Sequence, residues 1–180
     1  MQVKSLLLPV CLCCVGVSCD QGEPPPSMIV PGAFSSDHEV FAFLTLEDPY
    51  PQYTLFPHAD SVVVGSLNGS SAHRPAVRVT LNSRAASSLV DGRFPAGGSF
   101  RDSSVVFKEI RDGGSTPIFA VALKQRGNPL AQNGWLWAEY FPDGTTAYSI
   151  QKKGAGCIGC HSLEQGSQHD FIRTFERQAP

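Results

Sequence analysis

Two cysteines and a histidine stand together near the end of the chain, in the pentapeptide Cys157-Ile-Gly-Cys160-His161. This C-x-x-C-H arrangement is the attachment site of a c-type haem. Each thiol adds across one vinyl group of the porphyrin, so two cysteines at this spacing reach one edge of the ring. The adjacent histidine is then carried to the iron and supplies an axial nitrogen. The pentapeptide therefore predicts one covalently bound haem c, held by Cys157 and Cys160, with His161 as the proximal iron ligand.

Other uses of these residues are less well supported by the sequence. A redox-active C-x-x-C disulfide is typical of a thioredoxin-like βαβ setting, which the surrounding pattern lacks. A structural zinc site needs a second pair of ligands. The remaining cysteines all fall in the leader described next: Cys11, Cys13, Cys14 and Cys19. A chance match over five residues stays open.

Residues 1–19 have the composition of an export signal. Lys4 supplies a positive charge, and an apolar run from Leu6 to Val17 follows it. The run is too short to span a bilayer and lies at the start of the chain, so a signal peptide is favoured over a membrane helix. The small residues before Cys19 also fit a lipoprotein signal, in which Cys19 becomes lipidated. Ordinary cleavage and lipidation both stay open, and both place the protein in the periplasm or otherwise outside the cytoplasm, where haem c is attached.

The rest of the chain is long enough for one domain. The 180 residues are 42% hydrophobic, with a formal net charge of -2 and no basic run, which argues against a nucleic-acid-binding protein. Residues 20–34 include three consecutive prolines and predict a flexible tether. The haem domain is then expected at residues 35–180. Its many glycines and prolines indicate short strands joined by turns.

Periodicity predicts the elements that must position the haem motif. A helix is expected from Ser36, with acidic residues near its positive end. A second, capped by Asn82 or Ser83, is expected to end at Asp91-Gly92, and a third is expected over residues 169–178. Strands are expected at residues 61–67, 77–81, 103–110 and 117–124, with a β-hairpin formed by 135–141 and 145–151. This order predicts an α+β fold, a mainly antiparallel β-sheet with flanking short helices.

The coordination of the iron opposite His161 depends on whether the chain supplies a second axial ligand. Met1 belongs to the leader and Met28 to the tether, so a methionine-ligated electron carrier is not favoured. The histidines other than His161 are His38, His58, His73 and His169. Each is more simply interpreted as a surface or hydrogen-bonding residue, and His169 is expected on the same side of the ring as His161. We therefore expect a five-coordinate iron, which suits small-ligand binding or redox chemistry.

Four segments carry a resemblance to a known family. In chain order they are "HRPAVRVTLNSRAASSL", "SSVVFKEI", "NGWLWAEYFPDG" and "CIGCHSLEQGSQHDFIRTF", and the resemblance extends over roughly residues 73–176. They resemble the cytochrome P-460 and cytochrome c′-beta family. The resemblance implies a sheet-based fold, a homodimer and a five-coordinate, high-spin haem c. It also implies one of two activities: oxidation of hydroxylamine by a haem crosslinked to a lysine, or binding of nitric oxide in an apolar pocket.

Lys108 stands at the family's crosslinking position. Period two groups it with Val106 and Ile110, but both faces of that strand are mixed, so the pattern does not decide whether Lys108 points inward. A desolvated lysine has a lowered pKa and can act as a nucleophile, whereas a solvated strand lysine is the ordinary alternative. The hydroxylamine-oxidising relatives also have a carboxylate just before C-x-x-C-H. Residues 151–156 contain no acid, and Glu139 is the nearest upstream alternative.

Four further residues are predicted to line the haem pocket. Trp135 and Trp137 share a strand face and suit the wall of a porphyrin pocket, with the sheet core as the alternative. Phe171 is spaced i, i+4 from Phe175, which predicts one helix face over the haem or the sheet. Arg173 is placed to neutralise a haem propionate, with a solvated helical arginine as the alternative.

Three functions follow from these residues and the resemblance. The first is an exported monohaem c-type cytochrome that binds nitric oxide or a related small ligand at open iron. The second is an oxidoreductase that oxidises hydroxylamine or nitric oxide and passes electrons to a soluble redox partner. The third is a low-spin electron-transfer cytochrome. A link between Lys108 and the porphyrin favours the second, and a sixth protein ligand favours the third.

Overall fold

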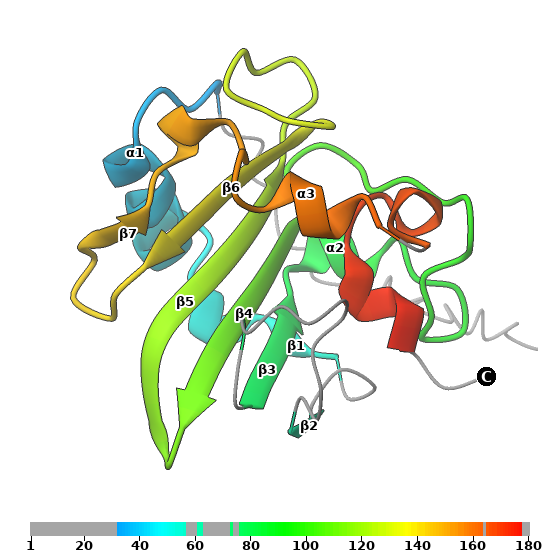
Figure 1. The fold of residues 1–180 in the computed structure, drawn as a ribbon, viewed down its shortest axis with the longest axis horizontal. Helices are drawn as coiled ribbons and strands as arrows, with labels where there is room; N and C mark the ends of the chain where they lie inside the picture. Colours follow the sequence, from blue (N-terminus) through cyan, green and yellow to red (C-terminus); the bar gives the residue numbers. More distant parts are fainter. Residues whose placement is uncertain (1–31, 57–60, 63–72, 74–75, 164, 178–180) are drawn as a thin grey trace, which may run out of the picture.

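The computed structural model describes residues 32–56, 61–62, 73, 76–163 and 165–177 (Figure 1). The predicted export signal, the tether up to residue 31 and His58 lie outside the described residues. No helix in the described part of the chain is long and apolar enough to cross a membrane.

A seven-stranded antiparallel sheet forms the centre of the fold. Its strand order is β1-β3-β4-β5-β6-β7, with β2 also pairing with β3. The strands are β1 (Thr54–Leu55), β2 (Ser61–Val62), β3 (Ala76–Leu81), β4 (Val105–Asp112), β5 (Ser115–Lys124), β6 (Trp135–Tyr140) and β7 (Thr146–Tyr148). The predicted α+β class with a mainly antiparallel sheet is confirmed, and so is the hairpin formed by β6 and β7.

Each face of the sheet carries its own core, because successive strand residues point to opposite sides. On β5, Phe119, Val121 and Leu123 belong to one core, which also contains Val40 of α1 (Asp37–Ala42). The opposite face packs against the C-terminal segment through the aliphatic and aromatic residues Val79, Leu81, Val106, Ala122, Trp135, Trp137, Ile172 and Phe175. In Figure 1, α1 (blue) and the C-terminal turns (red) lie at opposite sides of the molecule. Cys157 and Ile158 pack against this second core, so the C-x-x-C-H motif belongs to the second face.

Two of the three predicted helices begin where the sequence places their caps. α1 has a capping box at Ser36, whose side chain accepts from the Glu39 backbone N–H. It continues into a π-helical turn, Phe43–Glu47. α2 (Ser83–Ala86) begins after Asn82 but ends well before the predicted Asp91-Gly92. That dipeptide instead forms a tight turn with positive φ at both residues, flanked by paired neighbours.

The predicted helix over residues 169–178 is wrong. Two 3-10 turns, Gly166–His169 and Arg173–Arg177, take its place. Asp170 and Phe171 between them have φ values of 50° and 66°, which a right-handed helix does not allow. Phe171 and Phe175 therefore do not share a helix face. Phe175 is buried in the core, whereas Phe171 packs against it half-buried.

Asn82 joins the start of α2 to two other segments through a fully satisfied side chain. Its Oδ1 accepts from the backbone N–H groups of Ala85 and Val105, each at 2.9 Å. Its Nδ2 donates to Asp48 Oδ2 and to the Ser103 carbonyl, also at 2.9 Å. Only 3% of the residue is exposed, so water does not replace these partners.

Replacing Asn82 by alanine should lower the free energy of unfolding by about 3 kcal/mol, because it removes a helix cap and leaves buried backbone groups unpaired. Denaturant unfolding measures this difference. Asn82→Asp keeps the two acceptor contacts but puts a carboxylate oxygen against Asp48 and the Ser103 carbonyl, so it should cost at least as much as the alanine variant. Ser87→Ala, at an exposed position after α2, serves as the control and should stay within about 0.5 kcal/mol of the parent. Equal stabilities for Asn82→Ala and Ser87→Ala would contradict this account.

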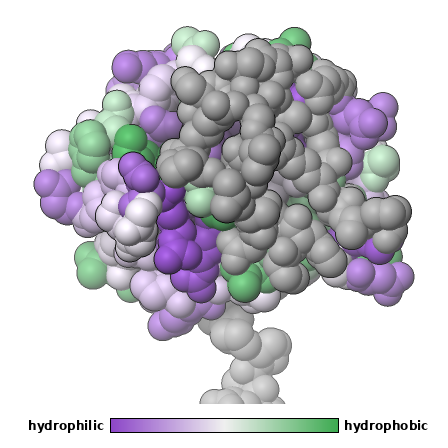
Figure 2. Space-filling view, turned by 60° about the horizontal axis from the view of Figure 1, so that its bottom comes forward, coloured by the Kyte–Doolittle hydropathy of each residue, from purple (hydrophilic) through white to green (hydrophobic). Residues whose placement is uncertain are grey.

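The described surface carries both polar and apolar side chains. Figure 2 shows hydrophilic and hydrophobic side chains interspersed over the described part of the face that it views. The large apolar side chains that are exposed come from separate elements: Leu46, Leu55, Val90, Phe141 and Leu163. Single exposed apolar residues are ordinary in water-facing surfaces.

Candidate functional site

The haem motif forms a single helical turn. α3 spans Ile158–His161, with Cys157 as its N-cap residue, and the His161 N–H donates to the Cys157 carbonyl at 3.0 Å. Residues i and i+3 of such a turn lie on one side, so the two cysteines share that side. Both thiols are free and half-buried. The loop before the turn needs Gly154, because its φ is +66° and an added Cβ would lie 2.5 Å from Cδ1 of Trp137.

The His161 imidazole is held in one tautomer. Its Nδ1 lies 2.5 Å from the carbonyl oxygen of Phe171. A carbonyl oxygen only accepts, so Nδ1 carries the proton and Nε2 keeps its lone pair. Burial lowers the pKa of His161 to about 3, and the nearby positive charges of Lys108 and Arg173 act in the same direction. A neutral imidazole with Nδ1 bonded to a backbone carbonyl is the state in which histidine binds a metal through Nε2.

The cysteine environment disfavours a dithiol redox centre. Burial raises the pKa of the Cys157 thiol to about 11, and the negative charge of Glu139 adds to the effect. Reactive redox cysteines have lowered pKa values instead. On the other cysteine, Arg173 Nη1 lies 3.2 Å from the Cys160 carbonyl oxygen and 3.5 Å from its Sγ. Arg173 is only 3% exposed, so it is buried beneath the motif and is not a solvated helical arginine.

The two tryptophans lie on the sheet face that carries the motif, so their predicted shared face is confirmed. The Trp137 ring meets the His161 ring edge-on, with centroids 4.6 Å apart. The ring centroids of Trp135 and Trp137 are 6.4 Å apart. Trp135 Nε1 donates to the Asp170 carbonyl at 2.7 Å. Trp135 also belongs to the sheet core, since it is fully buried. Trp137 thus packs directly against His161 on this face, and Trp135 packs behind Trp137.

A polar group interrupts the apolar face beside His161. Strand register aligns Lys108 of β4 with Ala120 of β5 and Glu139 of β6, so Lys108 and Glu139 project from the same face. His73 connects them: Lys108 Nζ lies 3.5 Å from its Nδ1, and Glu139 Oε1 lies 3.7 Å from its Nε2. Periodicity left the direction of Lys108 open, and the structure places it on the motif side. Glu139 is half-buried there, with 27% of its side chain exposed.

Among the described histidines, His73 is the one that lies beside His161, with ring centroids 6.4 Å apart. His38 is exposed on α1 at the opposite face. His169 is buried and has its Nδ1 3.2 Å from the Gln165 carbonyl oxygen. Burial lowers the pKa of His73, and the charge of Lys108 lowers it further, while Glu139 opposes both. The sequence named His73 as a surface or hydrogen-bonding histidine but did not indicate that Lys108 and Glu139 are its partners.

The residues present fit a haem c and do not fit a zinc site. In the part of the chain that the structure describes, no group of three or more His, Cys, Asp or Glu side chains is arranged to hold a metal ion. A structural zinc site requires four such ligands. A covalent haem requires two thiols and one neutral imidazole nitrogen, which α3 and its N-cap residue provide. No protein-family model matches the chain, and no curated protein matches it.

Proposed function

We propose that the protein is an exported monohaem c-type cytochrome with five-coordinate iron, which binds nitric oxide or a related small ligand. The observation that carries the proposal is the state of His161. It is neutral, its Nδ1 is bonded to the Phe171 carbonyl, and it ends a helical turn that also bears two free thiols. These are the requirements for two thioether bonds and one axial nitrogen.

The chain's own residues have distinct roles in this function. Cys157 and Cys160 would hold the porphyrin through thioether bonds, and His161 would bind the iron through Nε2. The haem supplies the iron that binds the small ligand. Trp137 and Phe171 exclude water around the imidazole, and Arg173 places a buried positive charge beside Cys160. The resemblance to the cytochrome P-460 and cytochrome c′-beta family adds a homodimer to this proposal, and the predicted export signal adds a periplasmic or otherwise exported location.

The methionines and the described histidines support an open sixth position. Both methionines lie in the leader or the tether. His73 is the described histidine beside the site, and its two ring nitrogens face Lys108 and Glu139. These contacts support a hydrogen-bonding role for His73, which leaves the distal side of the iron to an external ligand.

Oxidation of hydroxylamine or nitric oxide is the second candidate function. Lys108 lies on the haem-motif face, at the position where the family's crosslinking lysine stands. Glu139 and His73 beside it offer a proton acceptor, which residues 151–156 lack. Hydroxylamine loses protons as it is oxidised, so such an acceptor matters. Electrons would then pass to a soluble redox partner.

Titration of the reduced protein with nitric oxide tests the first proposal. One molecule should bind per haem, because the sixth position needs no displacement of a protein ligand. Lys108→Met should leave the absorption spectrum unchanged, as should the control Lys152→Met at an exposed position. A strongly red-shifted Soret band that Lys108→Met abolishes would favour the crosslinked oxidoreductase instead. Failure of nitric oxide to bind would refute the first proposal.

A further inference from the structure

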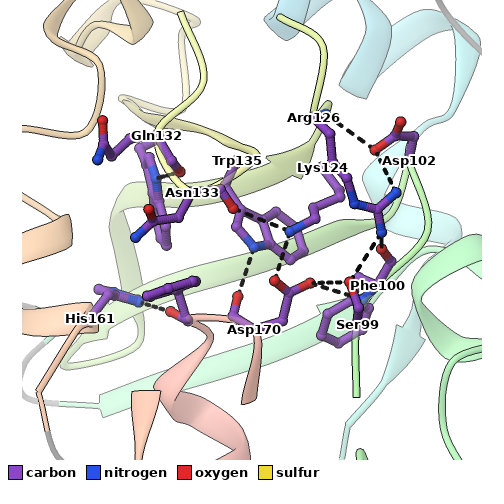
Figure 3. A network of polar contacts seen from close by, with 12 residues as sticks. Ser99, Phe100, Asp102, Lys124, Arg126, Gln132, Asn133, Trp135, His161 and Asp170 are labelled. Carbon is purple, nitrogen blue, oxygen red and sulfur yellow. Dashed lines mark hydrogen bonds and ion pairs between the residues drawn. The ribbon is translucent and has the colours of Figure 1, made fainter. Parts of the chain in front are cut away.

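We propose that the buried ion pair between Lys124 and Asp170 is a positioning device for the axial histidine, a role that rests on the proposed haem function. Lys124 Nζ lies 2.7 Å from Asp170 Oδ1, and the side chains are only 2% and 10% exposed. Figure 3 shows Lys124 and Asp170 beside Trp135, with His161 to the left of Asp170. A buried ion pair is weak evidence for stability, because desolvation offsets the attraction, so its position needs another explanation.

Asp170 is anchored from three separate segments. Lys124, at the end of β5, binds Oδ1. Oδ2 accepts from the Phe100 N–H at 2.9 Å and lies 3.4 Å from Ser99 Oγ. The Asp170 carbonyl accepts from Nε1 of Trp135, on β6, at 2.7 Å. Both carboxylate oxygens and the backbone of this one residue are therefore fixed.

This anchoring holds a backbone conformation that the chain would otherwise avoid. Asp170 and Phe171 have φ values of 50° and 66°, and a left-handed conformation is uncommon for residues other than glycine. The two residues are adjacent, so the orientation of Asp170 sets the direction of the Phe171 carbonyl. That carbonyl points at His161 Nδ1 from 2.5 Å. Contacts at Asp170 are thus transmitted through one peptide unit to the axial histidine.

The consequence for the haem is electronic as well as geometric. A partner of the ligating histidine's second nitrogen fixes the ring orientation and raises the basicity of the ligand. Lys124 is itself held, since its Nζ lies 3.3 Å from the Asn133 carbonyl and 4.7 Å from the centre of the Trp135 ring. The ion pair therefore fixes the carbonyl that sets the strength of the iron–histidine bond.

The iron–histidine stretching frequency, measured in two variants, tests this role. Asp170→Asn removes the charge with little change of shape, and the double variant Lys124→Met with Asp170→Asn leaves no uncompensated charge buried. In both, we expect the iron–histidine stretching vibration of the ferrous protein to move to lower frequency in resonance Raman spectra. We also expect about a tenfold shift of the ferric–ferrous equilibrium toward ferrous iron, about 59 mV for a one-electron couple.

Glu109→Gln is the matched control. Glu109 of β4 pairs with Arg78 of β3 at 3.5 Å, on the sheet face opposite to the one that packs against the C-terminal segment. The iron–histidine stretching frequency of this control variant should equal that of the parent protein. An unchanged vibration in both test variants, or an equal shift in the control, would overturn the proposal. If neither variant folds, the parent protein is compared with a ferrous haem whose imidazole ligand has no hydrogen bond at Nδ1. The proposal then requires a higher iron–histidine stretching frequency in the parent protein, and an equal or lower frequency overturns it. A parent protein without haem would refute the proposed function itself.

Discussion

Replacement of Cys157 and Cys160 together by serine should leave a protein with no covalently bound haem. The two residues are the free cysteines that the structure describes, and both belong to the turn that carries His161. Serine hydroxyls do not add to the porphyrin vinyl groups, so neither thioether bond forms. Intact-mass spectrometry of the exported protein, made in a host that attaches haem c, measures the result directly: the parent carries the haem mass and the variant does not.

The single variants refine this test. Cys157→Ser and Cys160→Ser should each retain one thioether bond, and their reduced pyridine spectra should lie between those of haem c and free haem. His161→Gly keeps both thiols and should retain the covalent haem mass. A double cysteine variant that still carries covalent haem would show that the attachment lies elsewhere and would remove the basis of the proposed function.

His161→Gly should keep the haem but lose the axial nitrogen. The iron then lacks its one protein ligand on this side. Because axial ligands set haem potentials over about 0.8 V, we expect the reduction potential to move by on the order of 0.1 V. Spectroelectrochemical titration measures this shift. The binding of nitric oxide should change with it, since the proximal ligand tunes the reactivity of the opposite position.

Added imidazole provides the decisive control for this variant. It should occupy the vacated position and restore the parent's spectrum, because the structure leaves room where the histidine ring packed against Trp137. His38→Gln, at an exposed site on α1, should match the parent without imidazole. A His161→Gly spectrum identical to that of the parent would mean that another residue binds the iron.

The sheet could be predicted from the sequence because its signals are local. In β3, Val77, Val79 and Leu81 alternate with polar residues, and the structure buries all three. The turn between β6 and β7 likewise follows from its Pro-Asp-Gly sequence. The C-terminal segment was mispredicted because its conformation depends on a tertiary contact. Lys124 and the Phe100 N–H hold Asp170 in a left-handed conformation, and no pattern within residues 169–178 signals those partners.

The candidate site was predictable only where one short segment contains it. The C-x-x-C-H spacing already identifies Cys157, Cys160 and His161. The contacts of Lys108 with His73, and of His73 with Glu139, join three distant segments. Their proximity depends on strand register, which a mixed hydrophobic pattern does not specify. Sequence alone therefore left the direction of Lys108 undecided.

The absorption spectrum of the reduced protein tests the central claim most directly, recorded for the parent and for His73→Leu. We predict an ordinary high-spin ferrous c-haem spectrum for both, because in the proposed function His161 is the iron ligand and His73 is a hydrogen-bonding residue. Sharp low-spin bands in the parent that His73→Leu abolishes would contradict the account and identify a six-coordinate electron carrier. Absence of haem absorbance from the exported protein would contradict it altogether.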